Sequence, residues 1–365
     1  MKNNPLDDII KCDVEISSPA SNDVSFDSIL MIVPEPSDGD KKKTMSKVTA
    51  ISSADELLDY SYKATDEVYV AATVAFAQNP APNELLICIR KKTDEDDQYE
   101  DMAVTLARAN AESNFYGIHI TSFRDKADVA ATVSWTEANE KLFGFEYTDY
   151  ADCPISNFAY YRSFGVFSGR ADGYSGDQPA ENKYLALAMM AKCFGYDPGT
   201  ETWAIKELAS VVPSGLSTEE KKELDGKNIN TFLRYSGSNV TIGGKTLAGE
   251  WIDVIRFRDW LKSEMQTNTF NAIKTNRKVP FTDNGIRLIE GKMEETLKAG
   301  QDIGGIAPTE YDADDNPIYG YEITVPSVSD LTEAERKSRR LTGCRWSARL
   351  AGAIHAVEIS GFLKF

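Results

Sequence analysis

The sequence predicts a mixed α/β (α+β) protein with a layered strand-helix domain, a helical C-terminal part and an extended β-strand arm at each end. Three patterns lead to this fold class. Short apolar runs alternate with helical patterns from residue 26 to 195, as in layered α/β domains. Two long amphipathic patterns follow in the C-terminal part. Finally, alternating or apolar segments near both termini have the period of a β-strand.

The composition favours a well-cored protein of about two domains, since a domain has roughly 150 residues. Of the 365 residues, 42% are apolar and 27% are charged. No apolar stretch approaches the ~20 residues that cross a bilayer, and the first residues lack a secretory signal pattern. Neither membrane insertion nor secretion through a signal peptide is therefore expected.

The formal charge of −17 argues against nucleic-acid binding, because phosphate contacts need a basic surface. The charge is unevenly distributed. Residues 1–40 hold nine acidic against two basic residues, a net of −7, and residues 331–365 hold seven basic against three acidic residues, a net of +4. Opposite charges at the two ends are compatible with end-to-end self-association.

The N-terminal arm is predicted from a strict alternation of side chains. Ile10, Cys12, Val14 and Ile16 lie on one side, with polar residues between them. This pattern indicates a half-buried strand, and the polar residues after Ser18-Pro19 leave it without a hairpin partner nearby in the sequence.

Between residues 26 and 195 the predicted elements alternate. A Ser53/Glu56 capping-box pattern opens one helix, and Pro80 ends another. The predicted strands are Ser28–Val33, Glu84–Arg90, Tyr116–Thr121, Lys141–Tyr147 and Phe158–Phe167, and the other predicted helices are Thr65–Gln78, Tyr99–Asn110, Lys126–Asn139 and Glu181–Phe194.

The C-terminal part begins with a charged helical turn and two strands that end at Gly243-Gly244. Long helices are expected over Ile252–Ile273 and Asn284–Ala299, and a hairpin around the acidic tip from Asp312 to Pro317. Asp330 is expected to cap a basic helix over Leu331–Arg340. Strands are predicted over Cys344–Ala348 and Ile354–Phe362.

No motif in the sequence supports a catalytic, cofactor or metal site. The only histidines, His119 and His355, lie in strand patterns without the nucleophile and orienting group of a catalytic triad. Gly243-Gly244-Lys245-Thr246 lacks the first glycine of a phosphate-binding loop. The Asp312 cluster has Pro317 where a calcium loop needs glycine.

The cysteines are five in number, scattered and without a CxxC motif, which favours reduced thiols. Because Cys12 and Cys344 both lie in predicted terminal strands, a disulfide between subunits stays open as an alternative. The one dense basic segment contains Arg336, Lys337, Arg339 and Arg340; it is either a solvated helix face or a contact with an acidic partner.

Several segments resemble contractile tail sheath proteins of bacteriophages and related injection machines. The similarity is carried by Gly199–Lys206, Leu224–Tyr235 with its Lys227-Asn228-Ile229-Asn230 run, Glu250–Leu261, the Lys278-Val279-Pro280-Phe281-Thr282-Asp283-Asn284-Gly285 entry to a helix, Gly352–Gly361 and, upstream, Ala71–Arg90. The resemblance implies four parts: an N-terminal arm over 1–25, an α/β domain over 26–195, a sheath core over 196–345 and a C-terminal arm over 346–365.

The resemblance further implies a non-enzymatic structural subunit without cofactors. Copies would form hexameric rings stacked into a helical sheath around a tail tube, and contraction would drive the tube through the target envelope. The arms, with Ile10, Cys12, Val14 and Ile16 at one end and Ile354, Val357, Ile359 and Phe362 at the other, would pair with neighbouring copies. The basic helix over 331–340 would face the tube.

Further implied partners are the baseplate and tail terminator proteins, and the implied location is a virion tail assembled in the host cytoplasm. Two alternatives remain open. One is the sheath of an R-type bacteriocin or another contractile injection system. The other, from a different class, is a cytosolic α/β enzyme; a tail-tube or adhesin subunit would have more β-structure.

Overall fold

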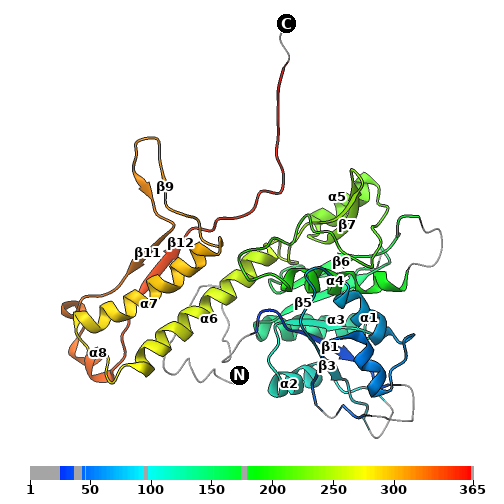
Figure 1. Ribbon diagram of the computed structural model, residues 1–365, viewed down its shortest axis with the longest axis horizontal. Helices are drawn as coiled ribbons and strands as arrows, with labels where there is room; N and C mark the ends of the chain where they lie inside the picture. The colour runs from blue at the N-terminus through cyan, green and yellow to red at the C-terminus, as the bar shows by residue number, and fades with distance from the viewer. Residues whose placement is uncertain are drawn as a thin grey trace. The chain divides into compact units, whose positions relative to one another are not determined.

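The computed structural model describes residues 25–36, 43–45, 47–93, 98–150, 152–173 and 179–362. The chain divides into two compact units, Met1–Ser263 and Glu264–Phe365. Figure 1 shows a sheet flanked by helices in the first unit, and two long helices with short strands towards the C-terminus. None of the helices in these described ranges is both long enough and apolar enough to cross a bilayer.

The first unit is built on an eight-stranded sheet with the order β2-β3-β1-β4-β5-β6-β7-β8. Its six inner strands are parallel, and the edge strands β2 and β8 pair antiparallel to their neighbours. The strands are β1 (Ile29–Val33), β2 (Thr49–Ile51), β3 (Leu85–Ile89), β4 (Gly117–Ile120), β5 (Leu142–Tyr147), β6 (Ser163–Phe167), β7 (Asn230–Tyr235) and β8 (Ser238–Ile242).

Helices cover both faces of this sheet, which explains why the inner strands are buried and mostly apolar rather than alternating between apolar and polar residues. Every residue of β1 is buried; Ile29, Met31 and Val33 join one core, and Leu30 and Ile32 join the other. The first core includes side chains of α1 (Glu67–Phe76) and α4 (Leu185–Phe194), and the second includes α2 (Met102–Glu112), α3 (Lys126–Ala138) and α5 (Thr218–Gly226).

Gly117 at the start of β4 allows α4 to approach the sheet closely. A Cβ atom at this position would lie 2.4 Å from the sulfur of Met190 and 2.7 Å from the ring of Phe194, both on α4. Any larger side chain would push the helix away from the strand, and the tight packing of the first core would be lost.

The structure differs from the predicted elements of this unit in five places. The predicted helix over Glu181–Phe194 begins as a 3-10 helix, η2 (Ala180–Tyr184), and is α-helical only from Leu185. The short edge strand β2 was not predicted, and β6 begins only at Ser163 rather than Phe158. The Ser53/Glu56 segment forms a 3-10 helix, η1 (Ala54–Tyr60), in which Ser53 makes no capping bond; Glu56 instead accepts from the backbone N–H of Ser52 at 3.1 Å. The sheet also continues past the expected boundary at residue 195, because β7 pairs with β6.

The second unit contains the end of α6 (Ile252–Thr275), a helix that runs across the boundary at residue 263, and α7 (Asp283–Asp302). Thr282 caps α7 by accepting from Gly285 N–H, and Ile286, Met293 and Leu297 form its buried stripe. The shorter elements are β9 (Glu310–Tyr311), β10 (Pro317–Ile318), β11 (Tyr321–Thr324), the 3-10 turn η3 (Val328–Asp330), α8 (Glu333–Ser338) and β12 (Arg345–Ala348).

Two small antiparallel sheets complete this unit. β9 pairs with β10 in the predicted hairpin around the acidic tip. β11 pairs with β12, and β11 packs against α7. The predicted strand over Cys344–Ala348 is therefore present, but its partner lies more than twenty residues upstream.

Candidate assembly site

The two-stranded sheet of β11 and β12 has two open edges in the part of the chain that the structure describes. Tyr321 is opposite Ala348, and Thr324 is opposite Arg345. Because Arg349 N–H donates to the carbonyl of Gly320 at 2.8 Å, the alternation of an antiparallel ladder directs the backbone groups of Ile323 and Trp346 towards the outer edges. An open edge of this kind is a template for a strand from another chain.

Residues 349–362, which follow this sheet, contain no strand, so the prediction of a strand over Ile354–Phe362 is wrong for the single chain. At its root, Ala351 N–H donates to Gly305 O at 3.1 Å. Beyond it the segment runs as an extended trace (Figure 1) with large apolar side chains in solvent: Ile354 is 83%, Val357 72%, Ile359 90% and Phe362 80% exposed. Apolar side chains exposed in this density mark a segment that binds another surface.

The predicted N-terminal arm, with Ile10, Cys12, Val14 and Ile16, lies outside the described residues. Among the cysteines that are described, Cys88, Cys153, Cys193 and Cys344 are free thiols. The expected disulfide alternative between Cys12 and Cys344 of neighbouring copies therefore stays a hypothesis.

The predicted basic helix is shorter than expected. α8 begins after Thr332, which forms a capping box with Glu335, so the prediction that Asp330 is the cap is wrong. Thr332 is the cap because its hydroxyl accepts from the backbone N–H of Glu335, and the Glu335 carboxylate in turn accepts from the backbone N–H of Thr332. The helix ends at Arg339, which has a left-handed φ of 58°.

All four basic residues of this segment are exposed. Arg336 and Lys337 lie on α8, Arg339 caps it and Arg340 follows it. Lys337 forms an exposed ion pair with Glu333 at 2.9 Å, and an Arg336 Nη2–H donates to Leu331 O at 3.1 Å. The segment therefore presents a cluster of cationic side chains to solvent, as a breakable electrostatic contact requires.

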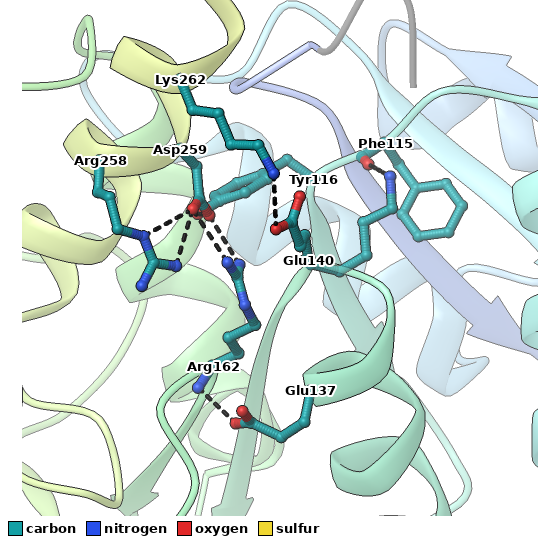
Figure 2. A network of polar contacts seen from close by, with 9 residues as sticks. Phe115, Tyr116, Glu137, Glu140, Arg162, Arg258, Asp259 and Lys262 are labelled. Carbon is teal, nitrogen blue, oxygen red and sulfur yellow. Dashed lines mark hydrogen bonds and ion pairs between the residues drawn. The ribbon is translucent and has the colours of Figure 1, made fainter. Parts of the chain in front are cut away.

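Sequence reasoning missed a buried polar cluster that attaches the first turns of α6 to the sheet (Figure 2). Asp259 lies at its centre and accepts from Arg162 at 2.7 and 3.0 Å, from the Tyr116 hydroxyl at 2.8 Å and from Arg258 at 2.8 Å. Tyr116 and Arg162 directly precede β4 and β6, so the contacts gather at the amino ends of parallel strands.

The electrostatics of this cluster favour the ionised carboxylate. Burial of Asp259 opposes ionisation, but the charges of Arg162 and Arg258 hold its pKa below the usual value. Beside it, Lys262 pairs with Glu140 at 3.3 Å. Lys141 donates to the carbonyl of Phe115 at 2.6 Å, and burial lowers the pKa of this lysine to about 8.

A second buried ion pair fixes α6 one turn earlier. Arg256 Nη1 lies 2.6 Å from Glu201 Oε1, and both side chains are almost fully buried. The Arg256 guanidinium also donates to the carbonyls of Phe26 and Tyr196 at 3.0 and 2.8 Å. All of these contacts are internal, so both clusters are structural attachments of a helix rather than an open site.

The motifs considered for chemistry are also occupied by internal contacts. His119 is buried beside Glu146 at 3.2 Å. The N–H groups of Gly244 and Lys245 donate to the Asn230 side chain at 2.6 and 2.9 Å, so they are not available to a phosphate. Asp312 accepts from the backbone of Asp314 and Asn316, and no group of three or more potential metal ligands occurs within the described ranges.

Comparison with known proteins gives the same fold along nearly the whole chain. A chain in the baseplate structure of the anti-feeding prophage is 16% identical, with 97% of this chain and 99% of that chain covered and a TM-score of 0.65. The helical sheath of the same prophage in the contracted state is 11% identical, with 96% and 99% covered and a TM-score of 0.64. The contracted PVC sheath complex of an extracellular contractile injection system is 12% identical, with 96% and 97% covered and a TM-score of 0.65.

The chain thus has the fold of contractile sheath proteins, and the predicted α/β fold class is confirmed. Its C-terminal part is more closely defined: residues 252–363 match the family of the E217 tail sheath protein gp31-like C-terminal domain. The resemblance to the tail sheath family inferred from the sequence is therefore confirmed. No curated protein sequence matches the chain.

Proposed function

We propose that this protein is the structural subunit of a contractile tail sheath that polymerises around a tail tube. The observation that carries the proposal is the β11–β12 sheet, whose two open edges lie within the matched tail sheath domain and next to an exposed, strandless C-terminal segment. A sheet with open edges and an exposed extended segment can complete each other when they come from different copies.

The arms link copies through backbone hydrogen bonds. An arm that adds about six bonds at ~0.5–1.5 kcal/mol each contributes roughly 3–9 kcal/mol before apolar burial. Residues 354–362 of one copy would pair with β11 or β12 of its neighbours, and so would the N-terminal strand that the sequence predicts, with Ile10, Cys12, Val14 and Ile16. Such contacts join two different surfaces of neighbouring copies. They generate a ring when the rotation from one copy to the next adds up to a full circle without a shift, and an open helix when it does not.

Contraction is then a change between two packings of linked subunits. The extended sheath is metastable, and a baseplate trigger lets the subunit bodies rotate and repack while the arms keep them connected. The energy is stored in the interfaces, so the protein acts without a catalytic site or cofactor. Shortening of the sheath drives the tube through the target envelope.

Arg336, Lys337, Arg339 and Arg340 are proposed to face the tube. A sheath must hold the tube during assembly and release it during contraction, which exposed charges allow and a large apolar seal would not. The other proposed partners are copies in hexameric rings, the baseplate and the tail terminator, in a virion tail assembled in the host cytoplasm. The sheath of an R-type bacteriocin or other injection device is the second candidate, because the related structures are injection systems.

Electron microscopy of the purified chain tests self-assembly directly. Long striated tubes are the expected result, and Val357→Pro should shorten or abolish them because proline removes an N–H group from the pairing arm. Deletion of residues 1–18 should have the same effect and leave a folded monomer. Ser360→Ala is the control: it changes a side chain of the same segment but keeps the backbone N–H, so this variant should assemble normally. A wild-type chain that stays monomeric at high concentration would rule the function out.

A further inference from the structure

The second unit carries opposite charges at the two ends of α7. At the end of α7, the β9–β10 hairpin presents an acidic tip with Asp312, Asp314 and Asp315. At its beginning, the turn between α6 and α7 presents exposed basic residues: Lys274, Arg277, Lys278 and Arg287. Figure 1 shows the hairpin rising from one end of α7 and the α6–α7 turn at the other.

Neither charged group is neutralised by the part of its own chain that the structure describes. Among the described residues, Lys274, Arg277, Lys278 and Arg287 form no ion pair. Asp314 and Asp315 likewise form none, while the Asp312 carboxylate accepts backbone N–H groups of the tip. Both surfaces therefore keep charge that an oppositely charged partner can neutralise.

The apolar neighbours of the two surfaces also match. Tyr311 and Tyr319 flank the acidic tip and are 68% and 58% exposed. The basic turn carries the partly exposed Val279 and Phe281. Tyrosine rings attract guanidinium and ammonium groups and are frequent binding anchors, so the hairpin offers both charge and contact area to the turn.

One chain cannot bring these surfaces together. α7 has 20 residues, which corresponds to about 30 Å of helix. The backbone of Ala307, which leads into the hairpin, is held at the end of α7 by a 2.8 Å bond from Gln301 Nε2, and Thr282 caps the other end. The contact therefore has to form between copies, head to tail.

We propose that the acidic hairpin of one copy docks on the basic α6–α7 turn of a second copy. This inference rests on the proposed self-assembly and adds a specific interface to it. The contact joins two different surfaces, so it propagates from copy to copy instead of closing a symmetric dimer. Because it uses exposed charges, it can break and re-form when the subunits rotate.

The test uses the full chain and charge reversal on each surface. The hairpin variant is Asp312→Asn, Asp314→Lys and Asp315→Asn, which keeps turn-forming side chains at 312 and 315 and changes the charge of these three tip residues from −3 to +1. The turn variant is Lys274→Glu, Arg277→Glu and Lys278→Glu, which changes the charge of the four basic residues from +4 to −2. Each variant should raise the critical concentration for polymerisation about tenfold or more, the effect of losing roughly 1.4 kcal/mol per contact. Glu84→Lys with Glu219→Lys adds the same charge as the hairpin variant, but at exposed positions of the first unit, and should leave the critical concentration unchanged.

Restoration identifies the partner surface. A chain with both sets of substitutions, and an equimolar mixture of the two variants, should polymerise within about threefold of wild type, since the reversed charges again match. This rescue also shows that the variants fold. Wild-type assembly of both single-surface variants would overturn the proposal, and so would weakened assembly without rescue.

Cross-linking tests this interface independently of whether the chain polymerises. In a mixture of an Asp314→Cys chain and a Lys278→Cys chain, a disulfide-linked heterodimer should form that neither chain gives alone. If the chains form tubes without this heterodimer, the interface is wrong and the proposed function stands. If the heterodimer forms but no tubes do, the interface stands and the proposed function fails.

Discussion

Arg162 and Asp259 form a bidentate buried ion pair, with guanidinium-to-carboxylate distances of 2.7 and 3.0 Å. Arg162 directly precedes β6, and Asp259 lies two turns into α6. The pair therefore holds the first turns of α6 against the amino end of β6.

Removal of the Asp259 charge should destabilise the first unit strongly. Asp259→Asn leaves the buried guanidinium of Arg162 without a counter-charge, which costs about 3–5 kcal/mol of unfolding free energy. Chemical denaturation measures this loss. In a double-mutant cycle, Asp259→Asn with Arg162→Met should recover part of it; strictly additive effects would show that the pair is not coupled.

Ionisation of Asp253 should lower stability above pH 6. Burial raises the pKa of this residue to about 6, and its Oδ1 has no hydrogen-bond partner among the residues that the structure describes. The folded protein thus binds more protons than the unfolded chain between about pH 4 and 6, so stability falls as pH rises through this window. Asp253→Asn should raise the unfolding free energy by about 1–3 kcal/mol at pH 7.5, in proportion to the pKa shift. A gain of the same size at pH 4 would contradict this assignment.

Replacement of Ile205 by glycine should stabilise the protein. This β-branched residue has a left-handed φ of 57°, held by bonds of the 205–206 backbone to Thr241, while its side chain is 52% exposed. The left-handed conformation costs a residue with a side chain about 1–2 kcal/mol, and glycine removes this cost. Glycine also increases the conformational entropy of the unfolded chain, which offsets part of the gain, so the unfolding free energy should rise by about 0.5–1 kcal/mol. Val104→Gly is the matched control: this residue is 53% exposed on α2, and the change should destabilise by a similar amount.

Charge reversal on the α8 segment should weaken assembly on the tube without unfolding the protein. Arg336→Glu, Arg339→Glu and Arg340→Glu change only exposed side chains, so the melting temperature should shift little. Co-sedimentation with purified tubes measures the effect, which should increase at low salt. The same reversal at Lys63, Lys91 and Lys222, exposed in the first unit, should leave tube binding intact. Normal tube binding by the α8 variant would contradict the proposal that this segment contacts the tube.

Local patterns predicted most of the elements but few of their ends. The apolar runs identified β1 and β3, and the stripe of Ile286, Met293 and Leu297 identified α7. Caps were less reliable, because several polar residues near a helix start compete for the same N–H groups; Thr332 rather than Asp330 caps α8. The three-residue strand β2 has too little sequence to show a period.

The sequence by itself determined the class of fold, because the spacing of apolar residues indicates whether a segment is a helix or a strand and which of its faces is buried. It also singled out the apolar C-terminal segment and the basic cluster around Arg336. Only the tertiary structure decided that residues 354–362 form no strand within one chain, because a strand exists only when a neighbour takes its hydrogen bonds. It alone placed Asp259 against Arg162 and set opposite charges at the two ends of α7, since both relationships join residues that are distant in sequence.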